Sequence, residues 1–354
     1  MRKKLLQRRA VLKGVAVLSM AVATRKGWTA DAAPTMTSKI DVEKAKAEGR
    51  LTLYTSLDTK IVDAIIAPFR KQYGINVEYF RGGSADVTSK VLAEADAGRI
   101  RADMVDASDL AALLLMKERG LLLAKQSDAA SAIPKDLRDP DGTWLADRLT
   151  QGVIQYNAKE FGGSQAPRTW KDLTAASMKG RLVFFSSANG DGAPRLYTMA
   201  QHLGWELVEA LAANRPIRVA TPQLVTQILE SGERGAAFAT NDNIAWRSKR
   251  EGKPTAYVYP PEGVPTEPGA VGLVKGSPSP HAAFLFHEYW MGKEAQQLLV
   301  EGGKYSSRTD VAPPQGSPPL GQIKLLTLDY AAYQAHRPEI LQRMTNIFGG
   351  EWGV

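Results

Sequence analysis

The segment GAAFATNDNIAW, residues 235–246, joins an apolar run to a run of side chains that form hydrogen bonds. Its first half is small and apolar and predicts a buried strand. Thr240, Asn241, Asp242 and Asn243 follow at once. Burying four such side chains without partners is costly, so water in an ordinary turn, their own backbone, or a ligand must satisfy them. These residues alone leave a turn and a binding site both open.

Two further polar groups combine glycine with serine just before a predicted helix. Helix N-termini present backbone N–H groups with partial positive charge, and hydroxyls and amides add donors and acceptors, so each group suits an anion. The alternatives are a tight turn in which Ser84 is the helix N-cap, and a solvated loop. The first group is Gly82, Gly83 and Ser84, and the second is Ser186, Ser187, Asn189 and Gly190.

Residue types that catalysis requires are scarce. The chain has no cysteine and four histidines, with no His-x-x-x-His pair, no dinucleotide fingerprint and no Gly-x-Ser-x-Gly elbow. We therefore expect a protein that is not an enzyme and that needs no cofactor and no resident metal.

Strands and helices alternate along the first part of the chain. LTLY, INVEYF and ADMVDASD predict strands, and helical stripes lie between them, closed by glycines such as Gly74. This order predicts a parallel α/β layer, in which ligands bind beyond the carboxyl ends of the strands. Thr55, Ser56 and Ser108 lie at such ends, and so does the Gly82 to Ser84 group.

A second α/β unit begins after the turn-rich stretch DPDGTWLADR. TWKDL predicts the start of a helix, and the strand signal before GSPSP begins at Gly269. With chain crossings near residues 149 and 267, we expect two lobes with a cleft between them: residues 33–149 and 267–324, then residues 150–266 and 325–354. Arg148 lies beside one crossing, where it could bind a ligand carboxylate or form a surface ion pair.

Most of the net charge of +8 lies in residues 1–32, which carry +7 and leave the remaining chain nearly neutral. This distribution excludes a nucleic-acid-binding surface of the usual basic kind. A basic head with Arg8-Arg9, a short apolar stretch and Ala30-Asp31-Ala32 predict a signal peptide over residues 1–32 of the twin-arginine type. We therefore expect export to the periplasm.

The order of these segments resembles that of the periplasmic substrate-binding proteins of ABC importers, in particular the type II, ferric-ion-binding-protein-like family. The most specific matches are PHAAFLFHEYWMGKEAQQLL and GGKYSSRTDV, and the resemblance covers essentially the whole chain after the signal peptide. It implies an α/β fold of two lobes, each with a mixed sheet flanked by helices, and a hinge of two crossing strands. It further implies a monomer that closes on a small-molecule ligand and delivers it to an ABC permease in the inner membrane.

The resemblance also implies where a ferric ion would bind. Ferric-binding members have two adjacent tyrosines at the positions of Asp242 and Asn243, a histidine near Asp58 and a glutamate near Ser108. Each of these ligand types is replaced here, and a ferric ion prefers several anionic oxygens. The family loop that matches Ser186 to Gly190 holds a phosphate. We therefore expect a small anionic or zwitterionic organic solute, with ferric iron or an iron chelate as the alternative.

Overall fold

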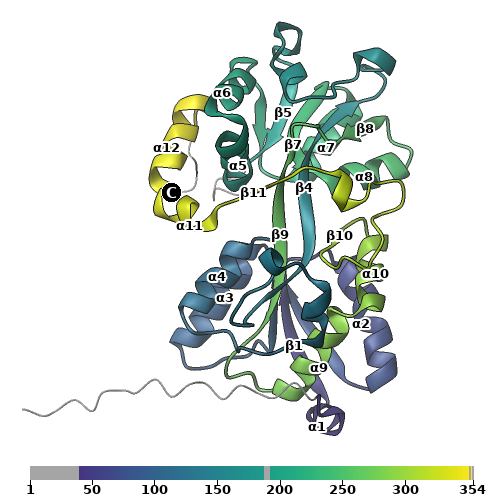
Figure 1. The fold of residues 1–354 in the computed structure, drawn as a ribbon, viewed down its shortest axis with the longest axis vertical. Helices are drawn as coiled ribbons and strands as arrows, with labels where there is room; N and C mark the ends of the chain where they lie inside the picture. The colour runs from purple at the N-terminus through teal and green to yellow at the C-terminus, as the bar shows by residue number, and fades with distance from the viewer. Residues whose placement is uncertain (1–39, 187–191, 351, 353–354) are drawn as a thin grey trace, which may run out of the picture. The chain divides into compact units, whose positions relative to one another are not determined.

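The computed structural model describes residues 40–186, 192–350 and 352, all of which belong to one compact unit. The signal peptide expected at residues 1–32 lies outside the described residues. So do three residues of the second glycine-serine group, Ser187, Asn189 and Gly190. The described chain forms two lobes connected by two long strands (Figure 1).

The first lobe is built around the parallel strands β2, β1 and β3, with β1 in the middle. Its helices end where the sequence predicts, because Gly49 and Gly74 adopt φ values of 67° and 71° that other residues rarely reach. Its elements are α1 (Val42–Glu48), β1 (Arg50–Thr55), α2 (Thr59–Tyr73), β2 (Asn76–Arg81), α3 (Ser84–Asp96), β3 (Met104–Ala107), α4 (Leu110–Glu118), α9 (Pro280–Trp290), α10 (Lys293–Glu301) and β10 (Tyr305–Ser306), with 3₁₀ turns η1 (Asp128–Ala132) and η2 (Lys135–Leu137).

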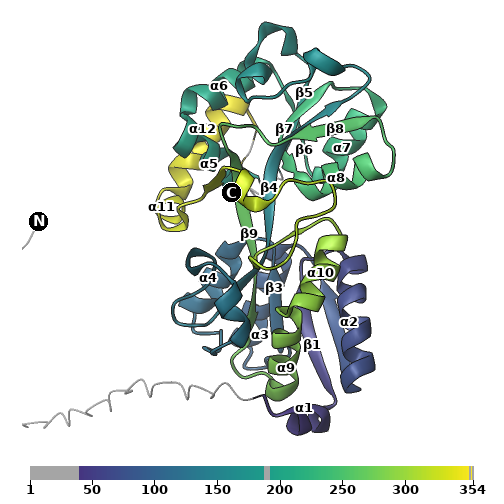
Figure 2. The same ribbon diagram turned by 45° about the vertical axis from the view of Figure 1, so that its right-hand side comes forward.

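The second lobe carries β5, β6, β7 and β8, with α5, α6, α11 and α12 on one side and α7 and α8 on the other (Figure 2). The helix predicted at TWKDL is instead a short 3₁₀ turn, because the backbone turns extended at Ala175. The elements are η3 (Gly163–Gln165), η4 (Lys171–Thr174), η5 (Ala176–Met178), β5 (Leu182–Phe185), α5 (Ala193–Leu203), α6 (Trp205–Ala213), β6 (Ile217–Val219), α7 (Pro222–Ser231), β7 (Ala236–Asn241), α8 (Asp242–Arg250), β8 (Thr255–Val258), η6 (Leu320–Gln322), β11 (Leu325–Thr327), α11 (Tyr330–Ala335) and α12 (Arg337–Phe348).

Strands β4 (Leu145–Asn157) and β9 (Val264–Leu273) join the lobes and pair antiparallel with each other. The strand order is β2-β1-β3-β9-β4-β7-β5-β6, so the two expected sheets share β4 and their ladders are continuous. Strand β9 begins five residues before the predicted start at Gly269. Pro265 and Pro268 concealed this part of the strand, since proline lacks the N–H that a ladder uses.

Each lobe has its own core. Both combine aliphatic and aromatic side chains: Phe69, Phe286 and Trp290 pack together in the first lobe, and Phe184 stacks on Phe238 in the second lobe at 5.0 Å between ring centroids. Burying each such side chain stabilises the fold by roughly 1.5–3 kcal/mol. These cores hold rigid the strand ends that carry the polar residues.

Candidate functional site

The polar run at residues 240–243 spans the end of β7 and the first turn of α8 (Figure 1). Asp242 and Asn243 are buried, with 2% and 6% of their surface exposed. Asn241 Oδ1 accepts a hydrogen bond from Arg195 Nη1 of α5 at 2.7 Å. The solvated turn is therefore a wrong interpretation, because other elements supply partners for Asn241, Asp242 and Asn243.

Asp242 and Asn243 are held by the hinge and by the first lobe. Asp242 Oδ1 accepts from the backbone N–H of Gln151 in β4 at 3.2 Å, and Asn243 Oδ1 accepts from Lys304 Nζ at 3.0 Å. Burial raises the pKa of Asp242 to about 7, although the charge of Lys304 and the N–H groups of Gln151 and Asn243 act in the opposite direction. This carboxyl group therefore exchanges its proton near neutral pH.

Lys304 lies between α10 and β10, and extending the β10–β4 register places it opposite Thr150. Its Nζ also donates to Thr150 Oγ1 at 3.4 Å. Among the described residues, no carboxylate oxygen lies within 4.0 Å of this ammonium group. Burial, followed by the positive charge of Arg148, lowers the pKa of Lys304 to about 8.

The three predicted serines of the first lobe meet at the ends of β1 and β3 and the start of α3. Ser56 Oγ and Ser108 Oγ are 2.8 Å apart, and the backbone N–H of Ser108 donates to Ser56 Oγ at 2.7 Å. Ser84 Oγ accepts from the same N–H at 3.1 Å. Gly83 is the N-cap of α3 and Ser84 its first residue, so the prediction of Ser84 as N-cap is wrong. We call Ser56, Ser84 and Ser108 the serine cluster.

Arg148 reaches the serine cluster from β4. Its Nη2 donates to Ser108 Oγ at 3.0 Å, while Nη1 pairs with Asp106 and contacts both carboxylate oxygens of Asp147 at 2.8 Å. The side chain is fully buried, so the surface ion pair considered above is wrong. Two buried carboxylates balance this guanidinium, which leaves Nη2 to fix the hydroxyls rather than to act as an unpaired cation.

The remaining predicted residues of the first lobe have local roles. The Thr55 hydroxyl is buried against Asp106. Gly82 allows close packing, since an added Cβ would lie 2.8 Å from the Asp86 Cβ, and the Gly83 N–H donates to Asp86 Oδ2 at 2.9 Å. The structure therefore does not bring Thr55, Gly82 or Gly83 into contact with the start of α8.

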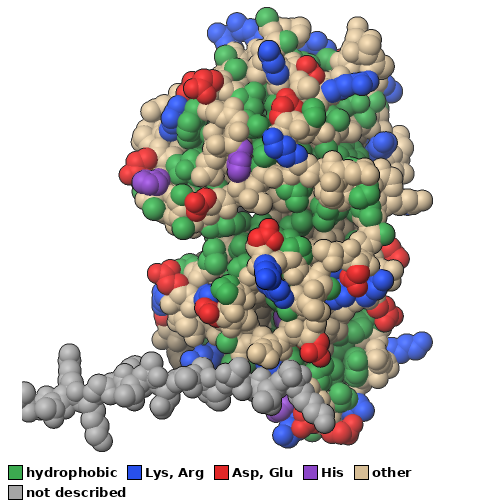
Figure 3. All heavy atoms as spheres, viewed as in Figure 1, with side chains coloured by type: hydrophobic (Ala, Val, Ile, Leu, Met, Phe, Trp, Pro, Cys, Tyr) green, Lys and Arg blue, Asp and Glu red, His purple; other side chains and the backbone are tan. Residues whose placement is uncertain are grey.

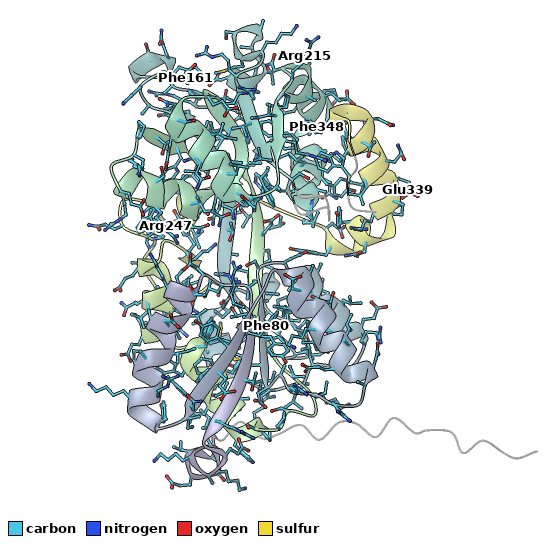
Figure 4. The ribbon with its side chains drawn as sticks, turned by 180° about the vertical axis from the view of Figure 1, so that it is seen from behind. Phe80, Phe161, Arg215, Arg247, Glu339 and Phe348 are labelled. Carbon is cyan, nitrogen blue, oxygen red and sulfur yellow. The ribbon has the colours of Figure 1, made fainter. Side chains whose placement is uncertain are left out.

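Asp58 lies at the boundary between the lobes. It caps α2 by accepting from the Lys60 N–H at 3.0 Å, and its Oδ2 is 3.4 Å from Arg247 Nη1 of α8. Arg247 projects from the edge of the second lobe that faces the first (Figure 4). This pair connects the predicted Asp58 to the helix that begins with Asp242.

Several buried polar atoms near these groups have no hydrogen-bond partner in the part of the chain that the structure describes. They are the side-chain amide of Gln151, Thr240 Oγ1 and Ser186 Oγ. Ser186 follows β5 and Thr240 belongs to the adjacent β7. An unmatched buried polar group costs about 1–3 kcal/mol, so such atoms mark places where a partner is missing.

A cavity of about 510 Å³ opens between the lobes. Ser84 and Asp109 line it from the first lobe, together with other residues of α3 and α4, and Gln334 of α11 lines it from the second. Figure 3 shows this face hollowed between the lobes. Tyr330, also in α11, packs against the cores of both lobes. The cavity therefore adjoins Ser84 of the serine cluster and is lined almost entirely by the first lobe, with Gln334 as its contribution from the second.

Sequence reasoning missed Lys304 and Arg195. Each contacts the start of α8 from a distant segment, 61 and 46 residues away along the chain. Neither position carries a local signal, because a lysine after GG and an arginine after Ala-Pro are typical of surface loops and helix starts. Only the pairing of β10 with β4 and the packing of α5 against the hinge bring them inward.

This region combines hydroxyl and amide groups with Lys304 and with arginines that are paired with carboxylates. Within residues 40–186, 192–350 and 352, no three His, Asp or Glu side chains are grouped so as to hold a metal ion. No helix in these ranges has the length and apolar character of a membrane span.

Comparison with known proteins identifies the relatives of this chain. A family model described as bacterial extracellular solute-binding protein matches residues 64–320. Iron uptake protein A1 of Synechocystis sp. is 25% identical over 269 residues, which cover 71% of this chain and 73% of that protein.

Solved structures show the same fold. Iron-bound HitA from Pseudomonas aeruginosa superposes with a TM-score of 0.72 at 19% identity, covering 84% of this chain and 99% of HitA. AfuA from Actinobacillus pleuropneumoniae, with fructose 6-phosphate bound, gives a TM-score of 0.72 at 23% identity and covers 85% of this chain and 98% of AfuA. The predicted fold of two α/β lobes with a two-strand hinge is confirmed.

Proposed function

Because the chain belongs to the bacterial extracellular solute-binding protein family, we propose that it is a periplasmic receptor that delivers a small anionic or zwitterionic organic solute to an ABC permease. The receptor works as a monomer without catalysis and is exported by the twin-arginine route. The solute binds between the lobes, at the start of α8 and the serine cluster. The proposed contacts are Ser56, Ser84, Ser108, Arg148, Ser186, Asn241, Asp242 and Asn243, together with Ser187, Asn189 and Gly190 outside the described residues.

The observation that carries this proposal is the set of cations around the first turn of α8. Arg195 and Lys304 contact Asn241 and Asn243 from two sides, and Arg148 contributes to the potential at Lys304. Arg148 and Arg195 are paired with carboxylates, so the attraction for an anion rests on Lys304, which has no carboxylate of a described residue within 4.0 Å. The hydroxyls of the serine cluster provide neutral partners for the other polar groups of an organic solute.

Phosphorylated and carboxylated solutes are the favoured classes. AfuA, which has this fold, was solved with fructose 6-phosphate. Ferric iron or an iron chelate is the second candidate, because iron is named for HitA and for the Synechocystis protein. A ferric ion would have Asp242 as a carboxylate at the start of α8, with Lys304 close by. This charge pattern favours the organic anion.

Calorimetric titration of the purified protein tests the proposal. Fructose 6-phosphate, inorganic phosphate, citrate, 2-aminoethylphosphonate and ferric citrate are titrated separately, with uncharged fructose as the control. We expect a metal-free anion to bind with at least micromolar affinity and fructose not to bind. Binding of ferric citrate alone, with citrate silent, contradicts the organic-anion assignment and supports the iron candidate.

A further inference from the structure

Lys304 differs from the other cations near α8 in its charge balance. Each of the three arginines that face it has a carboxylate of its own: Arg148 pairs with Asp106 and Asp147, Arg195 with Glu267, and Arg247 with Asp58. Lys304 is 9% exposed, and no carboxylate of a described residue lies within 4.0 Å of its Nζ. Its hydrogen-bond acceptors, Asn243 Oδ1 and Thr150 Oγ1, are both neutral.

Asp242 attracts Lys304 from beyond 4.0 Å, but burial raises the pKa of that carboxyl to about 7, so it is only partly charged near neutral pH. A buried ammonium group without a carboxylate at ion-pair distance is unfavourable. Removing one from water costs several kcal/mol even after the protein relaxes, and nearby like charges increase the cost. An ammonium also carries three N–H donors, and Asn243 Oδ1 and Thr150 Oγ1 use two of them. The natural way to offset the cost is an anion that arrives from outside the chain.

Building on the function proposed above, we infer that Lys304 is the residue that selects the acidic group of the solute and binds it as the close counter-ion that no described residue supplies within 4.0 Å of Nζ. Thr150 of the hinge strand β4 and Asn243 of α8 fix the position of Nζ. The lysine backbone leads directly into β10 of the first lobe. The acidic group would therefore bind where hinge, first lobe and second lobe meet.

This arrangement predicts that binding takes up a proton. An anion beside Nζ favours the charged lysine, whose pKa burial lowers to about 8 in the free protein, and it disfavours ionised Asp242, whose pKa burial raises to about 7. Both effects raise the proton occupancy of the complex, so affinity falls as pH rises through 7 to 8 and above. The charged and titratable groups that face this pair are Arg148 of β4, Arg195 of α5, Arg247 of α8, Tyr257 and Tyr259 at and after β8, and Tyr305 of β10.

The test compares Lys304→Met with a matched control, Lys125→Met. Lys125 is a second buried lysine, 6% exposed, whose Nζ lies 3.8 Å from the ring centroid of Phe284 in α9 rather than at α8. The same metal-free anions and fructose are titrated into wild type and both variants. We expect Lys304→Met to weaken the best anion by roughly tenfold to a hundredfold, as for a lost charged hydrogen bond, and Lys125→Met to leave it within about twofold.

The outcomes separate the two proposals. If wild type binds none of the anions, the proposed function is refuted. If wild type binds an anion and Lys304→Met binds it within about twofold of wild type, the role of Lys304 is refuted while the function stands. Should Lys304→Met fail to fold, wild-type titrations at about pH 8 in two buffers of different ionisation enthalpy decide the matter. Equal binding enthalpies in both buffers mean that no proton is taken up, and they overturn the inference. A difference between the buffers whose sign corresponds to protons taken up from the buffer supports it.

Discussion

Asp242 offers the sharpest test of the electrostatics at the start of α8, through the variant Asp242→Asn. Asparagine keeps an Oδ1 acceptor for the Gln151 N–H but removes the charge. Burial raises the pKa of this carboxyl from 3.8 to about 7. In the folded state it therefore binds more protons than in the unfolded state between these values, and wild-type stability falls as pH rises through this window and is level above it.

The size of the effect follows from the same shift. A shift of roughly 3 pKa units at about 1.4 kcal/mol each gives an upper limit near 4 kcal/mol above pH 7. The value of about 7 already includes the attraction of Lys304, which acts against burial. We therefore expect Asp242→Asn to be more stable than wild type by about 2–4 kcal/mol at pH 8 and by roughly 1–2 kcal/mol at pH 5.

Urea unfolding followed by tryptophan fluorescence at the two pH values measures this difference, provided that the slopes agree between variants. Asp172→Asn is the control of opposite sign. Although burial alone would raise the pKa of Asp172, the N–H groups of Arg168 and Thr169 lower it. Ionised Asp172 therefore makes its full contribution to the free energy of unfolding at pH 5 and at pH 8. Asp172→Asn should lose the same amount of stability at both pH values. A gain for Asp242→Asn that does not grow from pH 5 to pH 8 would show that Asp242 is ionised at little cost.

Three further substitutions probe the hinge and the boundary between the lobes. Arg148→Met should destabilise the protein by about 3–5 kcal/mol in urea, because Asp106 and Asp147 would stay buried without their cation; a loss below about 1 kcal/mol would mean that both carboxyls are protonated. Gly152→Ala should cost about 1–3 kcal/mol, since its Cβ would lie 2.8 Å from side-chain carbons of Arg195 and Pro265, whereas Gly162→Ala, whose Cβ meets nothing closer than 3.8 Å, should cost under about 1 kcal/mol. Equal costs would contradict the packing argument. Arg247→Gln removes a part-exposed pair with Asp58, so thermal unfolding should change by less than about 1 kcal/mol and the change should vanish in 1 M salt. A large loss of stability that persists in 1 M salt would show that the Arg247–Asp58 pair is shielded from solvent.

The sequence predicts the serine cluster well, for a general reason. Parallel strands place their carboxyl ends at one edge, so Ser56, Ser84 and Ser108 converge although 24 to 52 residues separate them. It also predicts a strand that gives way to polar residues from Thr240, and β7 ends within that polar run, at Asn241. Strand ends of this kind depend only on the local pattern of apolar and polar residues, so they can be predicted from one sequence.

The charge balance of the site cannot be predicted in this way. Arg148 looks like a surface residue beside a crossing, yet Asp106 and Asp147 make its burial tolerable. Whether an arginine is paired depends on contacts between segments far apart in the chain. The same holds for a lysine such as Lys304, which has no carboxylate of a described residue within 4.0 Å. The pKa of Asp242 depends on burial, which no local pattern encodes.

Residues 148–151 of β4 contact three neighbouring groups: the serine cluster, the Lys304 ammonium and the Asp242 carboxyl. Arg148 donates to the Ser108 hydroxyl, and Thr150 Oγ1 accepts from the Lys304 ammonium. The main-chain N–H of Gln151 donates to the carboxyl of Asp242. A twist of residues 148–151 of β4 that rotates one lobe relative to the other would displace these three contacts together. In the proposed receptor, ligand binding and movement of the lobes would depend on the same residues of β4, and any change that stiffens residues 148–151 should slow both.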